Sequence, residues 1–154
     1  MSQDPGGIDL QTSLGYLLKE ASSALRAAME EALRPFGMTI THYSCLELLA
    51  RRPGMSNSEL ARGAFVTRQS MNVLLQALER DGSVTRSTDA RVGKALPARL
   101  TPSGRRSLEK ASRAVRAVEL RMLAELTEPD QADALRILRS MVRSLREGPE
   151  GSRS

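Results

Sequence analysis

Apolar residues recur three and four positions apart through the first quarter of the chain, which is the spacing of one helix face. The run comprises Leu10, Leu14, Leu17, Leu18, Ala21, Leu25, Ala28, Met29 and Leu33. It predicts a long helix that begins at Ile8 and is ended by Pro35 and Gly37. A shorter run over residues 41–51 predicts a second helix, which a Pro-Gly pair ends.

The stretch from Ser56 to Thr101 predicts two short helices and then a β-hairpin. Its first four residues, Ser56-Asn57-Ser58-Glu59, have the S-x-x-E pattern of a capping box, which satisfies free N–H groups at a helix start. Thr67 can cap the next helix, and Gly82 ends it in the way a left-handed glycine does. The apolar stripe of this next helix consists of Met71, Leu74, Leu75 and Leu78.

The rest of that helix surface is mostly polar. Away from the stripe it carries Arg68, Gln69, Ser70, Asn72, Val73, Gln76 and Arg80. Small or forked hydrogen-bonding side chains crowd into the first turn and a half. They suit a helix N-terminus in a DNA major groove, where Arg reads guanine and Gln or Asn reads adenine. For an isolated helix, an ordinary solvated face is the alternative interpretation.

A basic hairpin follows this helix. Residues 83–88 and 95–100 are short runs with Val, Thr and Leu around a polar, glycine-containing tip, and Pro97 confines the second run to a sheet edge. From residue 83 to 106 there are six cationic residues against Asp89 alone, whereas the whole chain carries +5. The positive charge is therefore concentrated where a hairpin would lie along phosphates.

Two more helices complete the pattern. Thr101-Pro102 starts one that ends near Leu126, and Thr127-Glu128-Pro129-Asp130 starts the last. Their apolar stripes, with that of the first helix, exceed what a small central lobe could cover. This surplus predicts a homodimer.

The expected fold class is mainly α with a small β-hairpin: a winged helix-turn-helix with long dimerisation helices at both ends. The expected domain organisation is a DNA-binding lobe over residues 36–101 and a dimerisation region over residues 8–35 and 102–147. The polar ends, 1–7 and 148–154, are expected to be disordered.

Composition narrows the function classes. The chain has 154 residues, a single cysteine, a single histidine and no long apolar run or signal-peptide pattern, which predicts a cytoplasmic protein with no membrane partner. One Cys and one His cannot form a zinc site, so no metal and no cofactor is expected. We find no acid/base pair, nucleophile–His arrangement or phosphate-binding glycine loop, and therefore do not expect an enzyme.

The arrangement resembles the MarR (multiple antibiotic resistance regulator) family of winged helix-turn-helix regulators. The matching segments are Val66 to Gly82, Asp89-x-Arg91 and Leu100-Thr101-Pro102-x-Gly104. Three features depart from the family pattern: Ser83 stands where an apolar residue is usual, the hairpin tip reads Val92-Gly93-Lys94, and Pro97 interrupts the return strand.

The resemblance implies a DNA-binding transcriptional regulator, most often a repressor, that binds a pseudo-palindromic operator as a homodimer. It also implies that Arg91 enters the minor groove beside the operator and that Asp89 braces Arg91. The full set of expected DNA contacts is Thr67, Arg68, Gln69, Ser70, Asn72, Arg86, Asp89, Arg91 and Lys94. Arg86 and Lys94 are expected to bind phosphates.

The regulatory input has two interpretations. His42, Tyr43 and Cys45 lie in the helix over residues 41–51, beside which members of the resembled family often bind small aromatic or phenolic effectors. The same cysteine could instead be a redox sensor, or a plain buried core residue. The alternative to DNA binding itself is a protein–protein adaptor that keeps the winged-helix shape, which would have a neutral recognition surface.

Overall fold

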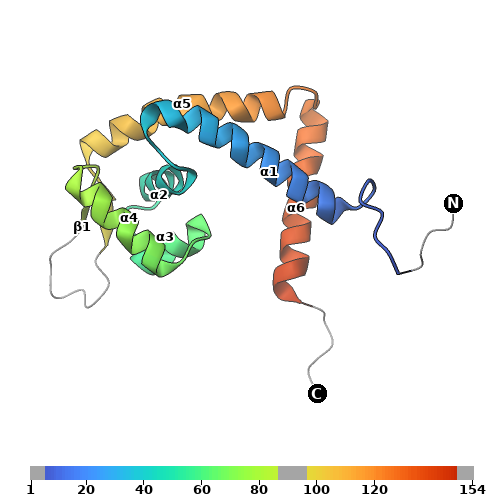
Figure 1. Cartoon of the computed structure of the whole chain (residues 1–154), viewed down its shortest axis with the longest axis horizontal. Helices are drawn as coiled ribbons and strands as arrows, with labels where there is room; N and C mark the ends of the chain where they lie inside the picture. The colour runs from blue at the N-terminus through green and yellow to red at the C-terminus, as the bar shows by residue number, and fades with distance from the viewer. Residues whose placement is uncertain (1–5, 87–96, 149–154) are drawn as a thin grey trace, which may run out of the picture. The chain divides into compact units, whose positions relative to one another are not determined.

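Six α-helices, one short 3-10 helix and a two-stranded sheet make up residues 6–86 and 97–148, the parts of the chain that this computed structural model describes (Figure 1). The disorder expected at the two ends and the contacts expected from the hairpin tip concern residues that lie almost entirely outside these ranges. In chain order the elements are α1 (Leu14–Leu33), η1 (Arg34–Phe36), α2 (Ile40–Arg51), α3 (Asn57–Ala64), α4 (Arg68–Arg80), β1 (Val84–Arg86), β2 (Ala98–Leu100), α5 (Pro102–Met122) and α6 (Glu128–Glu147).

The mainly helical fold class with a small hairpin is confirmed. The chain separates into two compact units, Met1–Val118 and Glu119–Ser154, so that the last turn of α5 belongs with α6. No helix within the described ranges combines the length and the apolarity that a membrane crossing needs.

The predicted start of the first helix at Ile8 is wrong, because α1 begins at Leu14. The backbone carbonyl of Asp9 accepts from the N–H groups of Thr12 and Ser13, and its carboxylate accepts from the N–H of Gln11. These bonds form a separate turn. Ser13 then adopts an extended backbone and caps α1 by accepting from the N–H of Tyr16.

The predicted caps of the central and last helices are present. Ser56, Thr67 and Thr127 each accept from the backbone N–H three residues on. Thr39, which was not predicted as a cap, does the same at the start of α2. At Ser56 only half of the capping box is formed. The Glu59 carboxylate accepts from the Ser56 hydroxyl and from the Arg52 guanidinium instead of from the backbone N–H of Ser56. The helix predicted to end near Leu126 ends at Met122, because Leu123 and Ala124 continue as a tight turn.

The core lies in the first unit and is made by the end of α1, α2, α3, α4, the two strands and the first half of α5. Its largest fully buried side chains are Leu33, Cys45, Leu46, Leu49, Leu60, Met71, Leu75, Leu78 and Val84. By contrast, α1 buries only Leu33 and α6 buries none of its residues. The long helices therefore leave most of their apolar side chains on the surface of this chain.

The hairpin has a third backbone contact that its sequence did not predict. β1 and β2 pair antiparallel, with Val84 opposite Leu100. On its other side, β2 forms an isolated bridge in which Ala98 donates to the carbonyl of Met55. The base of the hairpin is thereby tied to the segment that leads into α3.

Gly104 lets α5 start directly against the hairpin base. Thr101 caps α5 by accepting from the N–H of Gly104, and the Ser83 carbonyl accepts from the N–H of Thr101. A Cβ atom on Gly104 would overlap that carbonyl oxygen, which is backbone and cannot move aside. Ser83 is buried, and it occupies the position where the resembled family usually has an apolar residue. Its backbone carbonyl lies against Gly104.

We expect Gly104→Ala to destabilise the fold. The overlap should cost about 3 kcal/mol, against a gain of roughly 1 kcal/mol in helix propensity, so the net loss should be about 2 kcal/mol. Urea denaturation measures it. Ser103→Ala, at the exposed neighbouring position, should change stability by less than about 0.5 kcal/mol. Equal midpoints for the two variants would contradict the close approach.

Candidate nucleic-acid interface

Helices α3 and α4 form the helix-turn-helix, and the turn between them depends on an unusual residue. Phe65 caps α3 in the left-handed region, with φ 59°, which L-residues other than Asn and Asp seldom adopt. Its N–H and that of Val66 donate to the last carbonyls of α3. The Phe65 side chain is 83% exposed, so the ring is presented to solvent just before α4.

The core fixes which side of α4 faces outward. Met71, Leu75 and Leu78 are fully buried, whereas Arg68, Gln69 and Ser70 are exposed. The first turn of α4 contains no acidic residue. Its free N–H groups and the positive end of its dipole therefore face solvent without a competing carboxylate, which suits a phosphate.

Two of the predicted contacts, Thr67 and Ser70, are hydrogen-bonded to each other. The Thr67 oxygen accepts from the N–H of Ser70 at 3.0 Å, and its hydroxyl donates to Ser70 Oγ at 2.9 Å. Both hydroxyls lie on the exposed end of the helix. This pairing leaves Arg68 and Gln69 as the exposed side chains of the first turn that have their polar ends available.

The Arg86 side chain packs against α4 and is not free on the surface of the hairpin. Its side chain is only 13% exposed, forms an ion pair with Glu79 and donates to Asn72 Oδ1 at 3.3 Å. Asn72, another predicted base contact, is half-buried by this arrangement. The phosphate contact predicted for Arg86 stays a prediction, but the geometry favours a brace between β1 and α4.

The start of α4 is braced in a similar way by α3. Asn57 Nδ2 donates to the backbone carbonyl of Arg68 at 3.1 Å. With the Arg86 contacts, α4 is held at its first residue by α3 and near its last turn by β1. Such bracing keeps exposed side chains in a fixed geometry before a ligand arrives.

The predicted contacts at the hairpin tip, Asp89, Arg91 and Lys94, lie outside the described residues. The described part of the hairpin adds one cation that the sequence-based set omitted: Arg99 on β2 is exposed and lies opposite the exposed Thr85 of β1. Alternation along a strand places these two on the same, outward face. Strand register was the signal that could have identified Arg99.

The residues predicted for an effector lie on α2, where they are partly or fully buried. The Tyr43 hydroxyl is 3.2 Å from Ser112 Oγ and links α2 to α5. Burial raises the pKa of Tyr43 and lowers the pKa of His42, which the carboxylate of Asp81 partly offsets for the histidine. The imidazole is therefore neutral at pH 7, and His42 adds no positive charge to this helix.

Cys45 is fully buried, and burial raises the pKa of its thiol to about 12, although Arg86 opposes the shift. The thiolate is the reactive form of cysteine, so this environment suppresses oxidation at neutral pH. Among the described residues no group of three or more His, Cys, Asp or Glu side chains is placed to hold a metal ion.

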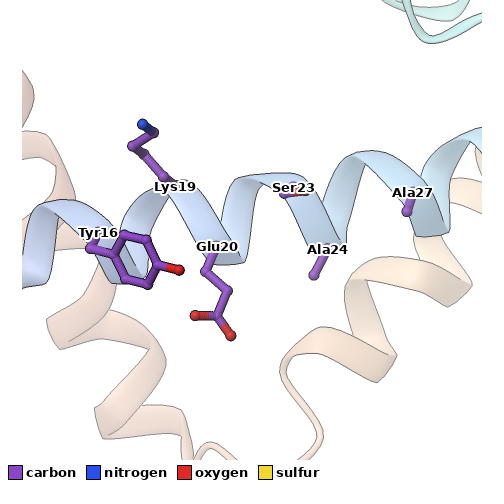
Figure 2. A pocket seen from close by; sticks show the side chains of 6 residues that line it. All are labelled: Tyr16, Lys19, Glu20, Ser23, Ala24 and Ala27. Atoms are coloured by element: carbon purple, nitrogen blue, oxygen red, sulfur yellow. The ribbon is translucent and has the colours of Figure 1, made fainter. Parts of the chain in front are cut away.

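A shallow hollow on α1 lies apart from the effector residues. Only exposed residues of α1 line it: Tyr16, Lys19, Glu20, Ser23, Ala24 and Ala27. Figure 2 shows Tyr16, Glu20 and Ala24 on one side of the helix, with Lys19 pointing away. None of His42, Tyr43 or Cys45 contributes to it.

Comparison with known proteins identifies the family. A family model described as "MarR family" matches residues 36–95. The HTH-type transcriptional repressor Rv2887 of Mycobacterium tuberculosis is 42% identical over 135 residues, which cover 88% of this chain and 97% of the relative. The chain belongs to the MarR family.

Solved structures of similar proteins bear on the interface. The M. tuberculosis protein Rv2887 is known in complex with salicylic acid (42% identity, 84% of this chain and 96% of that chain, TM-score 0.70) and with DNA (40% identity, 84% and 98%, TM-score 0.70). The transcriptional repressor CouR, bound to a 23-mer DNA duplex, is 27% identical over 94% of this chain and 100% of that chain, with a TM-score of 0.75.

We expect Arg86→Gln to lower the free energy of unfolding by about 1–2 kcal/mol. The substitution removes an ion pair in which the arginine is largely buried, and the 40% exposure of Glu79 keeps the cost below that of a fully buried pair. Arg51→Gln, which breaks the exposed Arg51–Glu47 pair, is the matched control and should cost at most about 0.5 kcal/mol. Unchanged stability with weaker DNA binding would instead support the phosphate contact.

Proposed function

We propose that this protein is a homodimeric transcriptional repressor that binds a pseudo-palindromic operator and is released by a small aromatic acid. The observation that carries the DNA-binding part is α4, whose acid-free first turn exposes Arg68 and Gln69 while Met71, Leu75 and Leu78 of the same helix are fully buried. The Rv2887 and CouR complexes with DNA, at 40% and 27% identity, support the same role for this chain.

The exposed apolar side chains of the long helices support the homodimer. On α1 they include Leu14, Leu17 and Leu18, and on α6 they include Leu135, Leu138 and Val142. Contiguous apolar stripes on a soluble chain mark an interaction surface. A second copy would cover them and would present two α4 helices to major grooves about 34–36 Å apart.

We assign the interface roles by what each side chain has available. Arg68 and Gln69 contact bases, and the start of α4, which Thr67 caps through Ser70, binds a phosphate. Asn72 contacts the edge of a base while Arg86 donates a hydrogen bond to it. In the wing, Arg91 enters the minor groove, Asp89 orients it, and Lys94 binds phosphate. Arg99 adds a further phosphate contact from the wing stem.

The Tyr43–Ser112 contact supports an effector role for the α2–α5 junction. A phenolic acid has the same hydrogen-bonding and aromatic groups as the tyrosine, and it could compete for this link between the DNA-binding lobe and α5. To weaken operator binding a hundredfold, such a ligand must prefer the released state by about 2.7 kcal/mol. The complex of Rv2887 with salicylic acid makes this the first compound to test.

Two observations support this proposal over a redox sensor and over a protein–protein adaptor. A redox sensor requires an accessible thiolate, whereas Cys45 is fully buried with its pKa raised to about 12. A protein–protein adaptor predicts a neutral recognition surface, whereas α4 begins with an exposed arginine and contains no acid in its first turn.

We expect the wild-type protein to bind a duplex from upstream of its own gene more tightly than a random duplex at physiological salt. Arg68→Ala should cost about 1–3 kcal/mol of binding free energy on that duplex. Arg34→Ala removes the same charge from an exposed position on η1 and should cost much less. Gel-shift titration at two salt concentrations measures both. Equal binding of random and upstream duplexes would refute the proposed function.

We expect salicylate to raise the melting temperature of the wild-type protein and to weaken its binding to the upstream duplex. Tyr43→Phe removes the hydroxyl that bonds to Ser112 and should reduce both effects. Thermal-shift measurements and gel shifts with benzoate as the comparison ligand test this. If no ligand of the series changes the melting temperature or the affinity for the duplex, the proposed effector is wrong, whereas the proposed DNA binding is unaffected.

A further inference from the structure

The exposed surface of α4 contains an apolar residue at its centre. Val73 is 59% exposed, although it lies in the same helix as three fully buried residues of the core. It follows Gln69 by four residues and precedes Gln76 by three, and both glutamines are exposed. The three side chains therefore form one strip along the outward face of α4.

Folding does not explain a valine at this position. Its β-branched side chain loses rotamer freedom in a helix, so alanine or a straight-chain polar residue would support α4 better. Within the described residues, Val73 is also absent from the apolar side chains that pack against the core. A residue that is unfavourable for the helix and exposed to water is explained more simply by a contact made on binding.

The chemistry of the major groove indicates what that contact is. The C5 methyl of thymine is the apolar group among the major-groove edges of the bases, and glutamine forms paired hydrogen bonds with adenine. At 1.5 Å per residue, the strip from Gln69 to Gln76 is about 10.5 Å long, which is about three base-pair steps of roughly 3.4 Å each. A Gln-Val-Gln strip is thus complementary to A·T pairs.

We propose that Val73 determines part of the operator sequence by contacting the C5 methyl of a thymine, between adenines read by Gln69 and Gln76. This inference rests on the proposed function, because it requires α4 to enter the major groove. It adds a specificity-determining residue that differs from the hydrogen-bonding contacts, and it predicts an A·T-containing segment in each half-site.

The test replaces each operator thymine in turn by deoxyuridine, which keeps every hydrogen-bonding group and removes only the methyl. Wild-type affinity should fall roughly fourfold at one thymine in each half-site, the loss expected for one buried methyl. Val73→Ala should weaken binding to the thymine duplex on the order of four- to tenfold and should be insensitive to deoxyuridine at that thymine. This loss of sensitivity is the coupling that identifies the contact.

Two controls separate the contact from an effect on folding. Val73→Ala should unfold at the same or a higher temperature than the wild type, because alanine supports the helix better. Val73→Thr keeps the branched shape and exchanges one methyl for a hydroxyl, so it should also weaken binding to the thymine duplex if the contact is apolar.

The outcomes distinguish this inference from the proposed function. If the wild type binds the upstream duplex but no thymine shows sensitivity to deoxyuridine, the assignment of Val73 is wrong and DNA binding stands. Equal deoxyuridine sensitivity of wild type and Val73→Ala would also overturn it, because the methyl would then be read by another residue. Absence of any sequence-specific binding by the wild type would overturn the proposed function itself.

Discussion

Burial of the apolar stripe of α4 is the constraint on which the rest of this structure depends. Met71, Leu75 and Leu78 are fully buried, and each contributes roughly 1.5–3 kcal/mol. Rotating α4 by one residue about its axis would turn the stripe out of the core and lose much of that stabilisation. The outward position of Gln69, Val73 and Gln76 is therefore a consequence of packing on the opposite side of the same helix.

Polar contacts then hold α4 at its two ends. Asn57 of α3 binds the carbonyl of Arg68, and Arg86 of β1 joins Glu79 and Asn72. The hairpin base is in turn tied to the segment before α3 by the Met55–Ala98 bridge, and to α5 by the contact of Gly104 with Ser83. These links join α4 and the base of the hairpin to the rest of the first unit.

The long helices follow a different principle. α1 buries only Leu33 and α6 buries none of its residues, so most of the burial that stabilises the central lobe comes from other elements. Their apolar side chains become useful only when another surface covers them. In a protein of this family, the proposed second copy would couple stability of these helices to the spacing of the two DNA-binding lobes.

The sequence by itself determined the helix caps, the apolar stripe of α4, the basic hairpin and hence the family, because these depend on residues close together in the chain. It failed at α1, where local bonds of Asp9 form a turn that apolar periodicity does not reveal. Only the tertiary structure decided that Arg86 is a half-buried brace, that the Cys45 thiol is inaccessible, and that Val73 is exposed between two glutamines. Burial and ion pairing depend on which distant segments pack together, and residue spacing along the chain does not specify that packing.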